Sequence, residues 1–587
     1  MKHFVKQSLF IFLLFLVCSN LSAQLPQLGK NKIEDIVAAM TLDEKIDLIM
    51  GLGDATWKNP PTGEKTVIID QAAGCTYKIP RLGIPPTVLA DGPAGLRINP
   101  SQEGADHLYY CTAFPTATAL ASTWNQQLVE NVGKAMGNEV REYGCDVFLA
   151  PAINIQRNPL CGRNFEYYSE DPLIGGKLGA AMIRGVQSNG VGTAIKHFVA
   201  NNQESNRQSV NEIISQRALR EIYLRGFEIA IKESAPWMVM SSYNRVNGFH
   251  TAENRELLTT ILRDEWGFKG MVTTDWFSGT DWTSQVYAGN DMLMPGCYQR
   301  DELKKAILDR RLDEKVLDRN VARILEYILK TPRFRNYRFS TRPDLAAHDI
   351  VARNAAEEAM VLLKNEGNTL PLKGVTTIAL FGKTSYHFIA GGTGSGEVNY
   401  KQAVSLQEGL AKGGFKISPS LQLCYLHYID SLVASKEDKD KKFAVDFSGE
   451  IALSDKLIND QVKKTAIAVI TIGRCSGEGW DRKEGDYFLI SQQERHLLKK
   501  VSQLYHAAGK KVVVILNIGG PIETASWKQY ADAILLSWQT GQEGGNALAD
   551  ILKGNANPSG KLAVTFPVNY TDVPSSTTFP GEPAENP

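Results

Sequence analysis

Short apolar segments alternate with longer amphipathic segments along the first 340 residues of the chain. The apolar segments have the length of strands, whereas stretches such as 216–234 repeat apolar residues at the spacing of a helix. Alternating strands and helices predict a parallel sheet covered by helices, and roughly 300 residues of this repetition is the length of a (β/α) barrel. We therefore predict an α/β fold with a (β/α)8-type barrel, regular or irregular, over residues 28–340. The apolar segments are 87–91, 146–151, 192–198, 237–244 and 270–276.

Polar residues stand at the ends of several predicted strands. Asp91, Tyr243 and Asp275 each end an apolar segment, and Lys196 and His197 lie near the end of another. The carboxyl ends of barrel strands meet on one face, where barrel enzymes carry their active sites. An aspartate after a strand is also a common turn or capping residue, so Asp275 in "GMVTTDWFSG" has a structural interpretation as well.

The second half of the chain has a different pattern. Residues 330–345 contain two prolines and no periodicity, and we place a linker between two domains at 341–350. A helical spacing of apolar residues then begins at Val351 and continues to Leu362. Strand-like runs follow, with helical segments between some of them, which predicts a smaller α/β sandwich domain over 351–568. The runs are "TTIALFG", "AIAVITIG", "VVVILNIG", "AILLSW" and "LAVTFP".

The two ends of the chain differ from the predicted domains. Lys2 and Lys6 precede an apolar run and a small-residue cleavage site near Ala23, which predicts a signal peptide at 1–23. We therefore expect a secreted or periplasmic protein. No later segment is apolar for long enough to span a membrane, so no membrane span is predicted. Residues 569–587 are predicted to be a C-terminal tail.

Composition excludes several classes of partner. Lys plus Arg and Asp plus Glu both number 64, so charge gives no argument for binding nucleic acid. The sequence has no HExxH and no paired Cys/His spacing, and we predict no metal. The glycine-rich stretch 391–399 lacks the Lys-Ser/Thr of a phosphate-binding loop. We predict no cofactor, interpret this stretch as a mobile loop beside a site, and leave the oligomeric state open.

Several short motifs carry charged and aromatic side chains in an order that spans both predicted domains. They are Asp91 and Arg97 in "ADGPAGLR", Arg163 and Glu166 in "CGRNFEYYSEDP", Lys196, His197 and Arg207 in "AIKHFVANNQESNR", Tyr243 in "MSSYNRVNG", Asp275 and Trp276 in "VTTDW", and Glu478, Asp481 and Arg482 in "GRCSGEGWDR". The ordered set resembles glycoside hydrolase family 3, the β-glucosidase family. The resemblance runs from about residue 33 to the C-terminus and includes "VVVILNIGGPIE", "WQTGQEGG" and "NPSGKLAVTFP".

The resemblance implies roles for individual residues. The family takes its nucleophile from the Asp-Trp motif, which is Asp275 here. The branch with "SGEG" in its second domain takes its acid/base from that motif, which places it on Glu478. Trp276 offers a flat apolar face for a sugar ring. The sugar-binding subsite would be lined by Asp91, Arg97, Arg163, Lys196, His197, Arg207 and Tyr243.

The resemblance predicts a retaining, exo-acting β-glucosidase that removes terminal non-reducing β-D-glucosyl residues through a covalent glycosyl-enzyme. Its partners would be β-linked oligosaccharides or glucosides. Retention needs two carboxyl groups about 5–5.5 Å apart, one ionised and one protonated. Asp275 and Glu478 are 203 positions apart, so only domain packing can bring them together. We expect cationic neighbours such as Arg163 to lower the pKa of Asp275, and burial or a nearby negative charge to keep Glu478 protonated.

Other interpretations remain open at this stage. Arg163 and Glu166 could form a local salt bridge, and we leave Glu166 out of the catalytic set. Lys196 and His197 could form a strand-end ion pair with a nearby acid, and Tyr243 could be a buried tyrosine with a bonded hydroxyl. A β-xylosidase or arabinosidase would use the same scaffold, and an inactive carbohydrate-binding protein would keep the cavity. Relatives commonly continue into a fibronectin-type III domain, which we expect to be absent here.

Overall fold

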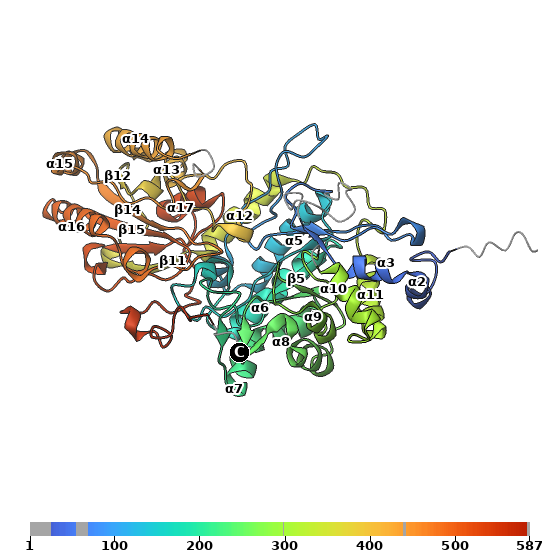
Figure 1. Ribbon diagram of the computed structural model, residues 1–587. Coiled ribbons are helices and arrows are strands. Elements are labelled where there is room, and N and C mark those ends of the chain that lie inside the picture. Colours follow the sequence, from blue (N-terminus) through green and yellow to red (C-terminus); the bar gives the residue numbers. More distant parts are fainter. Residues whose placement is uncertain (1–24, 54–67, 297–298, 438–441, 584–587) are drawn as a thin grey trace, which may run out of the picture.

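The computed structural model describes residues 25–53, 68–296, 299–437 and 442–583. The predicted signal peptide, 1–23, lies outside the described residues. Figure 1 shows two lobes, the first coloured blue to green and the second yellow to red. None of the described helices is both long enough and apolar enough to cross a membrane.

The first lobe is built around a curved sheet. Across the described residues this sheet has seven strands in the order β1-β2-β3-β4-β5-β7-β10. Neighbours from β3 to β10 are parallel, whereas β2 is antiparallel to both β1 and β3. The strands are β1 (Leu52–Gly53), β2 (Gly74–Cys75), β3 (Val88–Ala90), β4 (Val147–Phe148), β5 (Gly192–Phe198), β7 (Met238–Ser241) and β10 (Met271–Thr274).

Two isolated bridges close this sheet on itself. Thr273 in β10 pairs with Met292, and the next residue, Leu293, pairs with Met50, which lies just before β1. Residues 292–293 therefore fill the gap between the first and last strands of the sheet. The result is a (β/α)-type barrel of irregular form, as predicted. The barrel is irregular because β2 runs antiparallel to both of its neighbours. Antiparallel strands need no crossover helix between them, so the strict strand–helix alternation is broken there.

Helices connect the parallel strands and cover the barrel. Asn125 caps α5 and Asp171 caps α6, each by accepting a backbone N–H, and Pro172 occupies the first turn of α6 where its missing N–H costs nothing. The helical pattern at 216–234 forms α7, the π-helix η3 and α8 in succession. The main helices are α2 (Ile33–Ala39), α3 (Leu42–Ile49), α4 (Ala117–Ser122), α5 (Gln126–Glu142), α6 (Pro172–Gln187), α7 (Gln216–Ala218), η3 (Leu219–Tyr223), α8 (Arg225–Ser234), η5 (Glu256–Glu265), α9 (Trp282–Ala288), α10 (Arg300–Leu308) and α11 (Glu314–Ile328).

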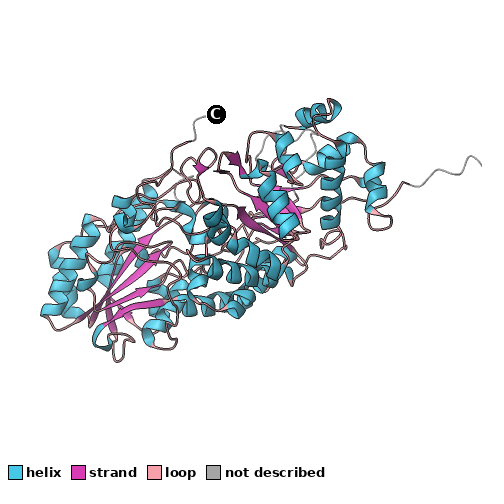
Figure 2. Cartoon of the chain, turned by 90° about the horizontal axis from the view of Figure 1, so that it is seen from below, coloured by secondary structure: helices cyan, strands magenta, loops and turns pink. Residues whose placement is uncertain are grey.

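The second lobe is a separate α/β domain, and Figure 2 shows helices on both sides of its strands. Among the residues described, its sheet has six strands in the order β11-β16-β15-β14-β12-β13. All neighbours are parallel except β11 and β16. The strands are β11 (Val361–Asn365), β12 (Thr377–Phe381), β13 (Lys416–Ile417), β14 (Ile467–Arg474), β15 (Lys511–Ile518) and β16 (Ala533–Leu536).

Two details differ from the sequence prediction. Four of the five predicted runs form strands, but residues 562–567, which the structure describes, form none. The edge of the sheet is instead β11, whose Leu362 we had assigned to the preceding helix. The helices of this domain are α12 (Leu345–Ala359), α13 (Leu406–Lys412), α14 (Pro419–Ala434), α15 (Asp455–Lys464), α16 (Gln492–Ala507) and α17 (Gly544–Lys553).

Helix α12 joins the two lobes. It begins at Leu345, inside the predicted linker 341–350, where Asp344 caps it by accepting the N–H of Ala347. It packs against α4 and α5 of the first lobe and against α17 of the second, and Figure 1 shows it between them. The small buried side chains on α12 allow this close packing on both sides, so the connection between the lobes is a packed helix.

Candidate active site

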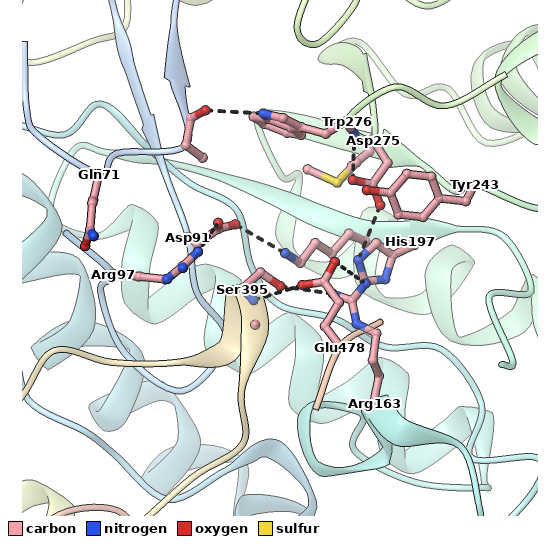
Figure 3. A pocket seen from close by; sticks show the side chains of 14 residues that line it. Gln71, Asp91, Arg97, Arg163, His197, Tyr243, Asp275, Trp276, Ser395 and Glu478 are labelled. Atoms are coloured by element: carbon pink, nitrogen blue, oxygen red, sulfur yellow. Dashed lines mark hydrogen bonds and ion pairs between the residues drawn. The ribbon is translucent and has the colours of Figure 1, made fainter. Parts of the chain in front are cut away.

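A cavity of about 310 Å³ lies between the two lobes, and we call it the interdomain cavity. Its first-domain side chains follow barrel strands at their carboxyl ends, as in other barrel enzymes. Asp91 follows β3, Asp275 follows β10 and Tyr243 lies two residues after β7. Lys196 and His197 come from the end of β5. The second domain contributes Gly394, Ser395 and Glu478. Figure 3 shows most of these side chains around one space.

Asp275 lines this cavity, and one of its two carboxylate oxygens has no hydrogen-bond partner among the described residues. Its Oδ1 accepts the backbone N–H of Trp276 at 2.7 Å. Its Oδ2 is buried and has no hydrogen-bond partner among the described residues, with His197 Nε2 3.8 Å away. Burial raises the pKa of Asp275 above its usual value, and the positive charge of Arg163 opposes this. The expected lowering of this pKa is therefore not what the structure indicates, because burial outweighs the cations.

Glu478 stands on the loop that follows β14. Its Oε1 accepts from Arg207 Nη1 at 2.8 Å and lies 3.6 Å from Arg163 Nη1. Its Oε2 accepts the backbone N–H of Ser395 at 2.8 Å. Burial favours a higher pKa, but Arg163, Arg207 and the Ser395 N–H outweigh it and hold the pKa of Glu478 well below its usual range. We had expected a protonated Glu478, and these two arginines explain the difference.

The remaining predicted residues surround these two carboxyl groups. Asp91 lies 3.7 Å from both Lys196 Nζ and Arg97 Nη1. Trp276 donates its ring N–H to the Ala73 carbonyl at 3.2 Å, which fixes the plane of the ring at the cavity wall. Of the ten predicted residues, nine line the cavity. Arg207 stands behind Glu478 and lies over the ring of Tyr243 at 4.3 Å.

Two cavity residues come from the glycine-rich loop 391–399, which the sequence places beside a site but does not assign to it. Ser395 binds Glu478 through its N–H, and its Oγ accepts from Arg163 Nη2 at 3.2 Å. Gly394 has a φ of 87°, and a Cβ there would lie 2.5 Å from the Cβ of Glu478. Only glycine allows this loop to pass so close to the glutamate. Sequence reasoning also missed Gln71, Ala73 and Met240 in the cavity wall.

Two carboxylates, one from each domain, accept hydrogen bonds that hold the Glu478 loop against the first domain. Glu204 Oε2 accepts the N–H of Gly479 and Arg207 Nη1, both at 2.7 Å. Asp481 accepts backbone N–H groups from Gly162 at 3.0 Å and Ser205 at 2.8 Å. Burial raises the pKa of Glu204 to about 7. The sequence motif contains Asp481, but nothing in its spacing shows that the residue binds the other domain.

Close packing supports the same contact. A Cβ on Gly162 would lie 1.9 Å from the carbonyl oxygen of Trp480, so only glycine fits there. Arg163, the next residue, pairs through Nε with Glu166, the local salt bridge that the sequence allowed. Arg163 Nη1 has no hydrogen-bond partner among the described residues and lies beside Glu478. The packing of the two domains therefore sets the position of Glu478.

Comparison with known proteins gives concordant results. The family models for the glycosyl hydrolase family 3 N-terminal and C-terminal domains match residues 101–327 and 360–585. The chain is 38% identical to the thermostable beta-glucosidase B of Acetivibrio thermocellus, covering 94% of this chain and 68% of that protein. It is 37% identical to the exo-alpha-(1->6)-L-arabinopyranosidase of Bifidobacterium breve, covering 93% and 68%.

Solved structures agree in fold. The structure of beta-glucosidase 3B from Thermotoga neapolitana in complex with glucose is 50% identical to this chain, with a TM-score of 0.90, and the match covers 94% of this chain and 78% of that one. A beta-glucosidase of this family from Bifidobacterium adolescentis is 36% identical, with a TM-score of 0.79, over 93% of this chain and 73% of that one. These matches confirm the family predicted from the motifs: the chain belongs to glycosyl hydrolase family 3 and is a glycoside hydrolase.

Proposed function

We propose that this glycoside hydrolase is a retaining, exo-acting β-glucosidase, with Asp275 as nucleophile and Glu478 as acid/base. One observation carries the proposal. Asp275, whose Oδ2 has no hydrogen-bond partner among the described residues, and Glu478 line the same interdomain cavity, one from each domain. Glycoside hydrolysis in most families uses two carboxyl groups that flank the scissile bond.

The reaction follows in two steps. In the first, Asp275 Oδ2 attacks the anomeric carbon, a new C–O bond forms, and the glycosidic C–O bond breaks while Glu478 gives its proton to the leaving oxygen. In the second, Glu478 takes a proton from water, the water oxygen attacks the same carbon, and the Asp275 carboxylate leaves. Two inversions give net retention, and Glu478 ends the cycle protonated.

The protonation of Asp275 and that of Glu478 depend on each other. Asp275 and Glu478 share a cavity, so they titrate as a pair. The first step needs Asp275 ionised and Glu478 protonated. Burial raises the pKa of Asp275, and two arginines lower that of Glu478, so both shifts oppose the protonation that the first step needs. A change that raises the pKa of Glu478 more than that of Asp275 favours the productive arrangement.

The choice of sugar rests on the cavity and on the relatives. A volume of about 310 Å³ suits one sugar residue, which fits removal of single units from a chain end. Asp91, Lys196 and Arg97 offer acceptors and donors for ring hydroxyls. The similar protein from Thermotoga neapolitana binds glucose. The arabinopyranosidase from Bifidobacterium breve, at 37% identity, makes an arabinoside the second candidate substrate.

A panel of nitrophenyl glycosides separates these candidates. We expect kcat/KM to be highest for the β-D-glucoside, compared with the β-D-xyloside, α-L-arabinopyranoside and N-acetyl-β-D-glucosaminide. A higher kcat/KM for the arabinopyranoside or the xyloside would identify that sugar, rather than glucose, as the one the enzyme removes. No hydrolysis of any of them by folded protein would favour a carbohydrate-binding protein. Proton NMR of the first product should show β-glucose, and α-glucose as first product would exclude retention.

We also propose that the protein is exported. The predicted cleavage near Ala23 supports secretion or a periplasmic location. N-terminal sequencing of the full-length protein, expressed in a bacterial host and recovered from the periplasm or medium, tests it. A mature N-terminus close to residue 24 is expected, and an intact Met1 on the recovered protein would contradict it.

A further inference from the structure

A second cavity, of about 300 Å³, lies within the second domain, and we call it the second-domain cavity. It has nearly the volume of the interdomain cavity and shares none of the described residues that line it. The two cavities lie on either side of the Glu478 loop, because Glu478 lines one and Trp480, Asp481 and Arg482 line the other. The mechanism above assigns nothing to this second space.

The topology of the sheet explains why a cavity forms here. The chain leaves β12 to build β13 on one side of it, and then returns to build β14 on the other side. In open α/β sheets, ligands bind beyond the carboxyl ends of two strands whose connections diverge in this way. Lys383, just after β12, and residues 473–475, at the end of β14, both line the cavity. It therefore occupies the switch point of this sheet.

The charges around the cavity balance. Of the described residues that line it, four are Lys or Arg and four are Asp or Glu. Two of them bind one another: Arg474 makes two bonds to Glu494, at 2.6 and 2.7 Å. Lys383 gives its ammonium hydrogens to Ser448 and to the carbonyl of Val445. Because the cationic and acidic lining residues are equal in number, a charged ligand would meet no excess of opposite charge, and a neutral ligand is favoured.

Two side chains in the cavity wall carry buried hydrogen-bond donors that have no partner among the described residues. Arg482 is only 3% exposed, yet its Nε and Nη1 have no hydrogen-bond partner in the described part of the chain. The buried hydroxyl of Tyr487 is also unpartnered there. A buried donor without a hydrogen-bond partner lowers the stability of the folded state by about 1–3 kcal/mol, so native proteins rarely leave one unsatisfied. The third nitrogen of this guanidinium, Arg482 Nη2, does have a partner: it donates to the Pro159 carbonyl of the first domain.

Aromatic rings complete the wall. The Phe447 and Trp480 rings meet edge to face with centroids 5.4 Å apart, and Trp480 meets Tyr487 in the same way at 6.0 Å. Phe447 is 54% exposed although it lies in this cluster. Flat apolar faces beside paired charged groups form a surface that contacts both the C–H face and the hydroxyls of a sugar. The interdomain cavity has the same make-up, with Trp276 beside Asp91, Arg97 and Lys196.

We propose that the second-domain cavity binds a neutral carbohydrate of one sugar ring. A hydroxyl both donates and accepts, so sugar hydroxyls can accept from Arg482 and Tyr487 and donate to Asp446, whose Oδ1 lies 3.1 Å from His387 Nε2. An anion would satisfy the donors but would face the carboxylates. The bound sugar would contact the loop that carries Glu478.

The test counts and locates glucose sites on the full-length protein. Equilibrium dialysis with labelled D-glucose should give two sites per chain, and hydrogen exchange should show protection in 443–450 as well as around the interdomain cavity. Asp91→Ala should remove the interdomain site and leave the second. Phe447→Ala should weaken the second site by about tenfold or more through the lost ring contact. Tyr487→Phe should weaken it about two- to tenfold, since one hydrogen bond is lost.

Tyr487→Phe deletes one hydroxyl and keeps the ring and its packing, so we expect the fold to stay intact. Phe447→Ala and Tyr487→Phe should leave kcat/KM for a nitrophenyl glucoside within about twofold of the native value, because neither lines the interdomain cavity. A single glucose site that Asp91→Ala removes would overturn the proposal, as would a second site that survives both changes. Inorganic phosphate serves as a second probe. Phosphate binding that Tyr487→Phe weakens, without glucose binding, would make this an anion site and also overturn it.

Discussion

Arg207 of the first domain donates its Nη1 hydrogen to Glu478 Oε1 of the second domain, at 2.8 Å. The same nitrogen lies 2.7 Å from Glu204 Oε2, and the guanidinium lies over the ring of Tyr243. The proposed acid/base thus owes its low pKa partly to a cation from the other domain. Domain packing sets the charge of Glu478 as well as its position.

Removing the Arg207 charge should move the pH profile. The charge lowers the pKa of both Asp275 and Glu478, so Arg207→Met should raise both. The acid limb reports ionisation of the pair, and the alkaline limb reports loss of its last proton. Both limbs of kcat/KM against pH should therefore shift to higher pH, by about one unit. The measurement is a pH profile with an aryl glucoside.

Arg217→Met provides the control, because Arg217 is an exposed arginine paired with Glu221 on the surface. It removes the same charge far from either carboxyl group and should leave both limbs in place. An unchanged profile for Arg207→Met, or a shift to lower pH, would mean that the Arg207 charge does not set the protonation of the pair.

Asp481 should act as a positioning residue for Glu478. Its carboxylate accepts N–H groups from Gly162 and Ser205 of the first domain, and Asp481→Asn turns an N–H toward one of these donors. Losing one charged hydrogen bond costs about 1.5–3 kcal/mol, so cellobiose turnover should fall about tenfold or more. The kcat/KM for a dinitrophenyl glucoside should fall much less, because that leaving group needs no acid.

Glu484→Gln is the matched control, since Glu484 is an exposed acid three residues further along the chain, at the start of the π-helix η10 (Glu484–Phe488). It should leave both substrates unaffected. Equal losses on cellobiose and on the dinitrophenyl glucoside for Asp481→Asn would show a general structural effect and would remove Asp481 from the positioning role.

Asp275→Gly should lose nearly all turnover and remain folded, because no covalent intermediate can form. The change also opens space beneath the anomeric carbon. Added azide should therefore restore activity on an activated β-glucoside and give the α-glucosyl azide, which NMR identifies. Hydrolysis at the native rate without azide would exclude Asp275 as nucleophile.

Asp91 should distinguish glucosides from xylosides. Its match to the family implies contacts with the hydroxyls on carbons 4 and 6, and charged hydrogen bonds are worth about 1.5–3 kcal/mol each. Asp91→Ala should lower kcat/KM for a β-glucoside at least about tenfold, and less for a β-xyloside, which lacks carbon 6. Equal losses on the two sugars would show that Asp91 does not bind the carbon-6 hydroxyl.

Sequence patterns predicted the fold where strands are long and buried. The runs that became β5, β14 and β15 are fully or almost fully buried strands of seven or eight residues, and their apolar composition identifies them. β11 was missed because it is a half-exposed edge strand that directly follows a helix. Residues 562–567 are apolar enough for a strand, but pairing depends on neighbours that the sequence does not show.

The site was predictable residue by residue, but its electrostatics were not. Family motifs named the residues that line the cavity, because each motif is local in sequence. The pKa of Glu478 depends on Arg163 and Arg207, which are more than 200 positions away and reach it only after the domains pack. Glu204 was missed for the same reason, since its bond to Gly479 crosses the domain interface.

As the proposed acid/base, Glu478 is needed in proportion to how much the leaving group requires a proton. Cellobiose leaves as a sugar alkoxide that requires a proton, whereas dinitrophenolate departs without one. Glu478→Ala should almost abolish cellobiose cleavage but keep kcat/KM for the dinitrophenyl glucoside close to native. Loss of the base then slows the second step, so a burst of dinitrophenolate should precede slow turnover. Azide should speed this turnover and give the β-glucosyl azide, because it attacks the covalent intermediate.

The most direct measurement is the pre-steady-state time course of dinitrophenolate release by Glu478→Ala, with cellobiose hydrolysis measured on the same preparation. We predict a burst of about one equivalent per active site, followed by slow release, with cellobiose cleavage almost lost. Equal slowing of both substrates, with no burst, would contradict the assignment of Glu478 as the acid/base.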